Sequence, residues 1–279
     1  MNLCVIGLGL IGGSMALTLK QKGIAARVVG VEASDDHARA ALELGLVDEV
    51  LPLAEAIDAS DIVLLAVPVD TLATLLPLVL NRVEKQVVFD AGSTKEAMLN
   101  AVSGHPRRGR FVAAHPMWGT EYSGPAAAVA NGFSGKAAVI CDREVSDADA
   151  LAKVEGIHRA LGMHLVYMNG RDHDLHVAYI SHISHITSFA LANTVLQKER
   201  EERAIFELAS GGFESTVRLA KSNPTMWVPI LRQNRDNVLD VLKEHISQLR
   251  RFEASLEQED YAALYELIAQ ANGIKRIIH

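Results

Sequence analysis

Several short stretches of this chain combine side chains that can move protons or hold anions. The stretch "AAHPMWGTE" (113–121) opens with small apolar residues typical of a buried strand and then places His115 and Glu121 in a turn-rich run. Pro116 has no backbone N–H, so we expect the strand to end there, with His115 at its carboxyl end. Ligands of open α/β sheets bind at that edge, where an imidazole can exchange a proton with them.

The stretch "VIGLGLIGGS" (5–14) has the G-x-G-x-x-G spacing of a dinucleotide-binding loop, between a predicted strand and a predicted helix. Gly7 would make the tight turn, Gly9 would let backbone amides approach a pyrophosphate, and Gly12 would let the helix pack on the strand. Because a helix N-terminus attracts phosphate groups, this stretch predicts a bound dinucleotide.

Glu32 indicates which dinucleotide is preferred. It lies 20 residues after Gly12, at the end of the second predicted strand. A carboxylate at this spacing accepts hydrogen bonds from the ribose hydroxyls of NAD and repels the 2′-phosphate of NADP. No Lys or Arg lies between Arg27 and Arg39 to pair with that phosphate, so we expect NAD. The alternative is an acid that only contacts solvent at the end of a strand.

Polar residues also follow the strand predicted at "QVVF" (86–89). In "DAGSTKEAM" (90–98), Ser93 and Glu96 have the spacing of a capping box, so we expect Ser93 to cap a helix on the same sheet edge as His115. A capping serine can present a helix N-terminus to a nicotinamide or a substrate. Together with the residues around these turns, the expected cofactor contacts are Gly7, Gly9, Leu10, Ile11, Gly12, Glu32, Val67, Pro68 and Ser93.

Four histidines lie in "RDHDLHVAYISHISHITSFAL" (171–191). On a single regular helix, Asp174, Ser181 and His185 would share one face and could line a pocket. The other three are interpreted as structural histidines: His173, His176 and His182. A metal site on His182 and His185 would lack a further pair of ligands, so we expect no metal.

Arg218 lies among apolar residues in "GGFESTVRLAKSNPTMW" (211–227). An arginine in such surroundings can clamp a carboxylate with two hydrogen bonds, or it can extend along the surface to solvent, and the spacing favours neither. Trp227 and Trp118 are expected to be core aromatic residues.

The elements that must position these residues fall into two domains. Over 1–168, short apolar runs alternate with helical stretches, which predicts a doubly wound, Rossmann-type parallel sheet. Two of its helices should end near Gly45 and Gly162. Over 169–279 only helical patterns remain. The longest carries an apolar stripe, typical of core packing or of a subunit interface: Val238, Leu242, Ile246, Leu249, Phe252 and Leu256.

Composition excludes several classes of function. The 279 residues have a formal net charge of −7 and no block of Lys and Arg, which disfavours nucleic-acid binding. No apolar run approaches the length of a membrane span, and the amino terminus lacks the basic region of a signal peptide. Cys4 and Cys141 lie in apolar stretches without metal-ligand spacing, so we expect buried reduced thiols in a cytoplasmic protein.

Taken in order along the chain, these motifs resemble the prephenate/arogenate dehydrogenase family of tyrosine biosynthesis. The resemblance rests on "GLGLIGGS", "DAGSTK", "AAHPMWGTE", "HDLHVAYISHISH" and "GGFESTVRLAKSNPTMW". It implies a dinucleotide-binding domain joined to a helical dimerisation domain, and hence a homodimer. It also implies oxidation of prephenate or arogenate by hydride transfer to a nicotinamide cofactor, with loss of the ring carboxylate as CO₂.

The resemblance also implies roles for individual residues. His115 would accept a hydrogen bond from the ring hydroxyl, with an apparent pKa near 6.5, and Ser93 would support His115 and the nicotinamide. Arg218 would bind a substrate carboxylate. Five further residues would shape or gate the pocket: Glu121, Asp174, Ser181, His185 and Trp227.

Two positions depart from the family pattern. Ser184 stands where many relatives have a helix-bending proline, and Pro229 in "MWVPIL" should kink or delay the following helix. Two alternatives also remain at this point. One is a β-hydroxyacid or imine dehydrogenase of the same two-domain plan, although such enzymes usually rely on a lysine of the helical domain. The other is a non-enzymatic NAD sensor.

Overall fold

The computed structural model describes residues 1–200 and 205–277. The chain divides into two compact units, Met1–Asn234 and Arg235–His279. The first unit contains an eight-stranded sheet and the helices that cover it. The boundary between the two compact units follows Asn234. The domain boundary expected after residue 168 remains a prediction.

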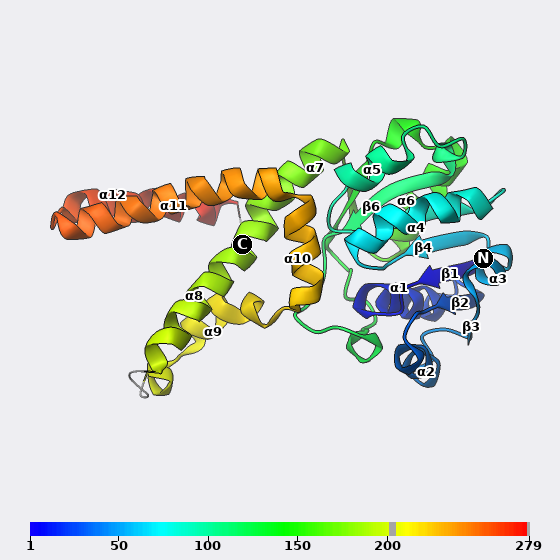
Figure 1. Ribbon diagram of the computed structural model, residues 1–279, viewed down its shortest axis with the longest axis horizontal. Coiled ribbons are helices and arrows are strands. Elements are labelled where there is room, and N and C mark those ends of the chain that lie inside the picture. Colours follow the sequence, from blue (N-terminus) through cyan, green and yellow to red (C-terminus); the bar gives the residue numbers. More distant parts are fainter. Residues whose placement is uncertain (201–204, 278–279) are drawn as a thin grey trace. The chain divides into compact units, whose positions relative to one another are not determined.

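The strands lie in the order β3-β2-β1-β4-β5-β6-β7-β8, with β1 between β2 and β4 (Figure 1). Alternation of buried apolar strands with helices explains this doubly wound order, as the sequence predicted. The strands are β1 (Asn2–Ile6), β2 (Arg27–Val31), β3 (Glu49–Val50), β4 (Ile62–Leu65), β5 (Val87–Asp90), β6 (Phe111–Pro116), β7 (Ala137–Cys141) and β8 (His164–Met168).

The expectation of a fully parallel sheet is wrong at one pair of strands. β6 and β7 are antiparallel, whereas the other pairs are parallel. The segment between them carries only the short 3₁₀ turn Pro125–Ala127, so no crossover helix returns the chain to the opposite end of the sheet. The sheet is therefore mixed but mostly parallel.

Helices cover both faces of the sheet. One apolar core takes side chains from α1 and α6, and the other takes side chains from α3, α4 and α5. Burial on both faces fits strands that are continuously apolar. The helices are α1 (Leu10–Gln21), α2 (Asp35–Glu43), α3 (Leu53–Asp58), α4 (Val69–Arg82), α5 (Glu96–Val102) and α6 (Ala148–Ala160).

The helix starts differ from the one capping prediction made from the sequence. Ser34 caps α2 by accepting a hydrogen bond from the backbone N–H of His37. Ser93 does not cap α5, because this helix begins at Glu96 after Lys95, without a side-chain cap from its own N-cap residue. The prediction of a capping box at Ser93 and Glu96 is therefore wrong.

The chain after the sheet is helical, as predicted. It forms α7 (Gly170–Val177), α8 (Ile183–Glu199), α9 (Gly211–Val217) and α10 (Pro224–Gln233), with one π-helical turn, Ala178–His182, between α7 and α8. Pro229 lies inside α10 and does not delay it, since α10 starts at Pro224 under an Asn223 cap. The expected delay at Pro229 is thus wrong.

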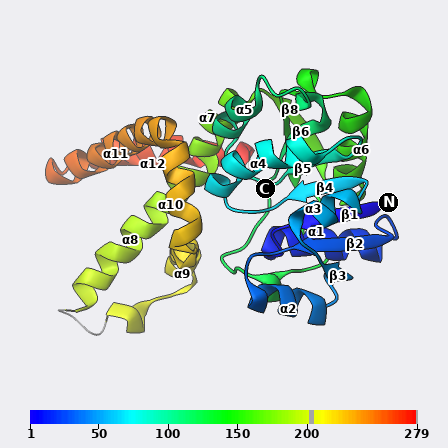
Figure 2. The ribbon, with the colours of Figure 1, turned by 45° about the vertical axis from the view of Figure 1, so that its right-hand side comes forward.

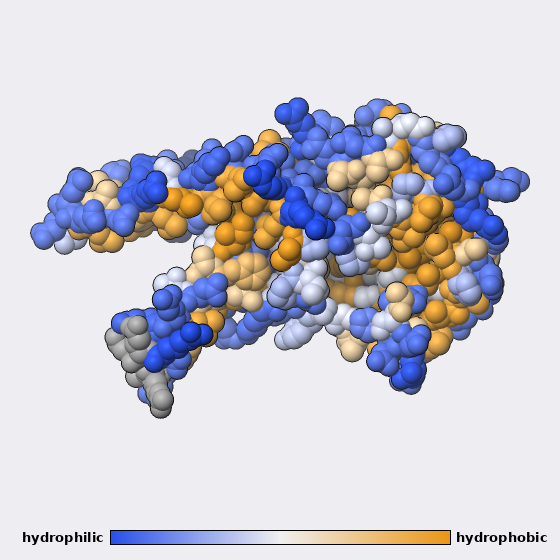
Figure 3. Space-filling view, in the orientation of Figure 1, coloured by the Kyte–Doolittle hydropathy of each residue, from blue (hydrophilic) through white to orange (hydrophobic). Residues whose placement is uncertain are grey.

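The second unit contains α11 (Arg235–Glu257) and α12 (Tyr261–Ala271), which lie side by side (Figures 1 and 2). Apolar side chains reach the surface along this pair (Figure 3). Leu249, Tyr265 and Ile268 are all more than half exposed. The predicted apolar stripe of α11 is therefore only partly covered within the chain. Among the described residues, no helix is long and apolar enough to span a membrane.

Candidate active site

The glycine loop has the geometry that its spacing predicted. Gly7 has φ of +94°, and a Cβ there would lie 2.6 Å from the carbonyl oxygen of Ala66. A Cβ at Gly12 would lie 2.1 Å from the carbonyl oxygen of Gly7, so the helix packs against the turn only because this side chain is missing. Gly9, the N-cap of α1, has no atom within 4 Å of an added Cβ. The loop therefore leaves open space at a helix N-terminus, which fits a dinucleotide pyrophosphate.

Glu32 is tied to this loop. One carboxylate oxygen accepts a hydrogen bond from the N–H of Leu8 at 2.9 Å, and the other accepts from Ala33 and Ser34 at 3.0 and 3.1 Å. The side chain thus joins the end of β2 to the glycine loop, so it does more than contact solvent. The other expected cofactor contacts lie nearby, since Leu10 and Ile11 open α1, Val67 borders Gly7 and Pro68 precedes α4.

His115 lies at the carboxyl end of β6, as predicted, and contacts a second histidine. Its Nδ1 lies 2.8 Å from Nε2 of His173, and Nδ1 of His173 lies 2.8 Å from Oδ1 of Asp174. His173 is fully buried, and Asp174 is almost so. Three polar side chains are therefore linked from the sheet edge into α7. The prediction of a purely structural His173 did not anticipate this link.

Asp174 takes the capping position that was predicted for Ser93. Its carboxylate accepts hydrogen bonds from the backbone N–H groups of Lys95 and Glu96, at 2.8 and 2.9 Å. A side chain of α7 thereby caps α5, and the Asp174 carboxylate points to the start of α5 and to His173. Ser93 lies half-buried in the turn before α5.

Lys95 and Asp90 form a fully buried ion pair close to the two histidines. Asp90 also accepts hydrogen bonds from the N–H groups of Gly92 and Ala114, which ties β5 to the strand that carries His115. A buried pair of this kind needs such additional hydrogen bonds to offset desolvation. The pair therefore places one positive and one negative charge in fixed positions near the two histidines.

The pKa of His115 is held well below 6.5. Burial is the main cause, followed by repulsion from His173, Lys95 and His182. Burial also lowers the pKa of His173, against the opposing effect of Asp174. The surroundings of His115 therefore favour a pKa below the ordinary value of 6.5 that was expected from the sequence.

Two amide side chains at the end of α10 hold Asp174 and the turn before α5 in position. Asn234 donates a hydrogen bond to the carbonyl oxygen of Asp174 at 2.6 Å, and its amide lies 3.1 Å from Nδ1 of His182. Gln233 accepts a hydrogen bond from the hydroxyl of Thr94 at 2.7 Å. Burial lowers the pKa of His182 to about 4. Neither amide was singled out from the sequence, because a polar pair at a helix end usually faces solvent.

His185 and Trp227 form a stacked pair. Their ring centroids lie 3.5 Å apart with an interplanar angle of 28°, and Nδ1 of His185 is 3.0 Å from the carbonyl oxygen of Ser181. Trp227, a residue of α10, also packs in one of the two apolar cores, as expected of a core aromatic residue. Three of the predicted pocket residues thus come together, although Asp174 does not join them.

Arg218 pairs with Glu121 across a long sequence separation. Nη1 of Arg218 lies 3.0 Å from Oε2 of Glu121, and half of the Arg218 side chain is exposed. A hydrogen bond to its own backbone and the ion pair with Arg218 lower the pKa of the Glu121 carboxyl group. The guanidinium is therefore held at the surface by a carboxylate, in a position from which it can exchange partners.

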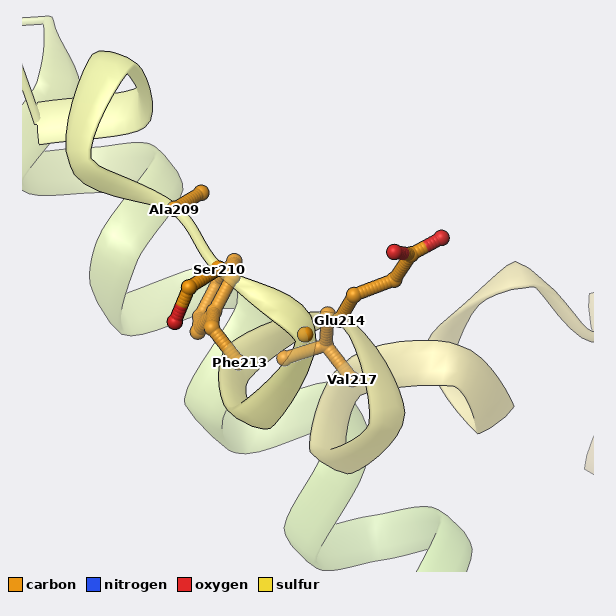
Figure 4. A pocket seen from close by; sticks show the side chains of 6 residues that line it. Ala209, Ser210, Phe213, Glu214 and Val217 are labelled. Carbon is orange, nitrogen blue, oxygen red and sulfur yellow. The ribbon is translucent and has the colours of Figure 1, made fainter.

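Two surface pockets lie elsewhere than at His115. One of about 320 Å³ is formed around α9, with Phe213 and Val217 on its wall, and the Glu214 carboxylate points away from them (Figure 4). The other, of about 590 Å³, lies between α5 and α7 and includes Glu96, Asp142 and Asp172. Neither contains His115. Among the described residues, no cluster of side chains could hold a metal ion.

Comparison with known proteins agrees with this geometry. The family profile "Prephenate dehydrogenase, nucleotide-binding domain" matches residues 15–167, and "Prephenate dehydrogenase, dimerization domain" matches residues 169–270. The chain belongs to the prephenate dehydrogenase family. It is an oxidoreductase of the prephenate dehydrogenase type, which confirms the resemblance found in the sequence. The two alternatives, a non-enzymatic NAD sensor and a β-hydroxyacid or imine dehydrogenase, are not supported.

Relatives extend over nearly the whole chain. A prephenate dehydrogenase of Bacillus subtilis is 33% identical over 98% of this chain and 75% of its own length. The A. aeolicus prephenate dehydrogenase, solved with hydroxyphenyl propionate and NAD⁺, superposes with a TM-score of 0.88 at 28% identity, covering 99% of this chain and 97% of that one. Synechocystis arogenate dehydrogenase gives a TM-score of 0.76 at 27% identity, covering 99% of both chains.

Proposed function

We propose that His115 is the base in the oxidation of prephenate to 4-hydroxyphenylpyruvate, with NAD⁺ as the hydride acceptor. The observation that carries the role of His115 is its position at the carboxyl end of β6, on the sheet edge that also carries the glycine loop. The bound cofactor supplies a site for hydride. The protein must therefore remove the hydroxyl proton and exclude other reactions.

Proton balance favours a base that can also act as an acid. As hydride leaves the ring carbon, the hydroxyl proton passes to His115 and a carbonyl forms. Loss of the ring carboxylate as CO₂ then pushes electrons towards that carbonyl, and the resulting phenolate takes the proton back. No net proton is released, so a half-buried imidazole that takes up and returns one proton meets the requirement.

Charged and aromatic groups of the helical segments would bind the rest of the substrate. Arg218 would exchange Glu121 for a substrate carboxylate, while His185 and Trp227 would offer a flat wall to the ring. Ser181 and Ser93 would line the same region. Asp174 is not proposed to touch the substrate, because its carboxylate is engaged with α5 and His173.

Choice between prephenate and arogenate depends on how the pocket meets a keto or an amino group. The names of relatives include prephenate, cyclohexadienyl and arogenate dehydrogenases. We propose prephenate as the preferred substrate. Steady-state kinetics followed at 340 nm with both substrates tests this, and a higher kcat/KM for arogenate would refute it.

We propose that NAD⁺ is preferred to NADP⁺ because Glu32 would face the 2′-phosphate. Its carboxylate lies beside the loop that would hold the pyrophosphate, where it could accept hydrogen bonds from the adenosine ribose. The expected result is a kcat/KM for NAD⁺ about 100-fold above that for NADP⁺, which corresponds to roughly 3 kcal/mol. Equal use of the two cofactors would contradict this assignment.

We also propose that the protein is a homodimer. The matched dimerisation profile covers α11, and the exposed apolar side chains of α11 and α12 would be buried by a second copy. Sedimentation velocity at low concentration tests this proposal. A single species of the chain mass, 30.2 kDa, would exclude it.

A further inference from the structure

We propose that His173, oriented by Asp174, is a positioning residue that fixes the tautomer of His115 and shares the proton that His115 takes up. This inference rests on the proposed role of His115 as a base. The three residues are joined by two contacts of 2.8 Å, His115 Nδ1 to His173 Nε2 and His173 Nδ1 to Asp174 Oδ1. His173 would act through His115 and would not touch the substrate.

The argument begins at the carboxylate. Asp174 receives hydrogen bonds from two backbone N–H groups, those of Lys95 and Glu96, and backbone N–H groups can only donate. The Asp174 oxygens are therefore acceptors, and a nitrogen that contacts one of them must donate. It follows that the Nδ1 atom of His173 carries a proton.

The same logic fixes the next two nitrogens. A neutral imidazole has one N–H, so Nε2 of His173 has a free electron pair and accepts a hydrogen bond. The contacting Nδ1 of His115 must then be the donor. This leaves Nε2 of His115 without a proton, and Nε2 is the atom on the far side of the ring from His173. The carboxylate thereby determines, through two rings, which nitrogen of His115 can act as a base.

The pair also changes what happens after proton uptake. Once Nε2 of His115 has taken the hydroxyl proton, the bond from its Nδ1–H to His173 becomes charge-assisted and stronger. The positive charge is shared along the line towards Asp174. The positive charge of Lys95 opposes this cation, and the negative charge of Asp90 favours it. His182 also opposes it. Asp174, which contacts His173, and Asp90 therefore make a temporary cation tolerable here.

The first test needs no substrate. In wild-type protein with ¹⁵N-labelled histidine, His115 is expected as the Nδ1–H tautomer at pH 7, with an unprotonated Nε2. An Nε2–H tautomer of His115 would overturn the proposal. Because this measurement is independent of turnover, its result stands whether or not the protein oxidises prephenate, so failure of the proposed function can be told apart.

Variants at position 173 test the consequence for rate. His173→Asn removes the acceptor for Nδ1 of His115, so kcat should fall about 100-fold while KM changes less than about 3-fold. His173→Gln places an amide oxygen near the former Nε2 position and should recover about 10-fold of that loss. The matched control is His176→Asn on the exposed face of the same helix, which should leave both constants unchanged.

Two outcomes of the variant series would refute the inference. One is a loss in His173→Asn that appears in KM alone. The other is an unchanged kcat together with an unchanged His115 tautomer. Thermal unfolding and the ¹⁵N spectrum of His173→Gln show whether this variant is folded. A folded His173→Gln that keeps the Nδ1–H tautomer of His115 but recovers no kcat also counts against the proposal.

Discussion

The glycine loop and the histidine centre lie on one sheet edge but are built in opposite ways. The loop is contiguous, and its shape depends on side chains that are missing at Gly7 and Gly12. The histidine centre joins His115 of β6 to His173, 58 residues later, and Lys95 to Asp174, 79 residues later. A site made of local backbone can be predicted from spacing, whereas a site made of distant side chains needs the tertiary fold.

Replacing His115 should have the largest effect. In His115→Asn, we expect kcat to fall by about 10²- to 10⁴-fold with little change in KM, because the lost base acts mainly in the transition state. Binding of NAD⁺ to the glycine loop should be unaffected, as titration of the variant by fluorescence would measure. Near-normal kcat in this variant would remove His115 from the reaction.

Replacing Arg218 should separate binding from chemistry within the side-chain site. Arg218→Ala removes a charge-assisted bond of about 1.5–3 kcal/mol, so KM for prephenate should rise roughly 10- to 150-fold with a smaller change in kcat. Glu121→Gln serves as the partner variant, since it releases the guanidinium without removing it. A drop confined to kcat in Arg218→Ala would show that this residue does not anchor the substrate.

Two glycine variants should divide the loop into a binding position and a folding position. Gly9→Ala meets no neighbour, so the protein should fold normally and bind NAD⁺ about 10-fold more weakly. Gly12→Ala would force a methyl group against the carbonyl of Gly7 and should cost about 1–3 kcal/mol of stability. Calorimetry with and without NAD⁺ measures both effects, and equal unfolding temperatures for the two variants would contradict the assignment.

The pH profile should show the smallest but most specific difference. Neutral His115 is the active form and its pKa is lowered, so kcat/KM should rise with pH through a midpoint well below 6.5. Stopped assays from pH 4.5 to 8 would locate this midpoint. The same limb should persist in Gly9→Ala, because a Cβ at Gly9 contacts no neighbouring atom and so leaves His115 and its partners unchanged. A midpoint at or above 6.5 would mean that the imidazole is solvated.

Much of the nucleotide-binding half could be predicted because its signals are local. Alternating strands and helices, Gly7 with its positive φ, Ser34 as a cap and His115 at a strand end all follow from short stretches. The direction of β7 could not be predicted in this way. It depends on what the chain does between two strands, and "KAAVIC" is equally apolar in either orientation.

The histidine centre was predicted only in part. The helical wheel assumed one regular helix over the whole stretch, which grouped Asp174 with His185 and assigned His173 to structure. The π-helical turn separates these residues into two helices, and Asp174 caps α5 while His185 stacks on Trp227. A His-Asp pair near a helix start, two strands after the strand of a predicted base, was the signal that could have identified His173.

The π-helical turn has a consequence for how the pocket can be altered. A π turn amounts to one residue inserted into an α-helix, and each inserted residue rotates the remainder of the helix by about 100°. Deleting one residue within Ala178–His182 would therefore turn the whole of α8 about its axis while leaving α7 and its contacts with α5 in place. An insertion or deletion in this turn would rotate α8 with His185 as a unit and would shift His182 against Asn234, while His173 and Asp174 stay on α7. Such changes therefore offer a route to altered substrate choice that point substitutions do not.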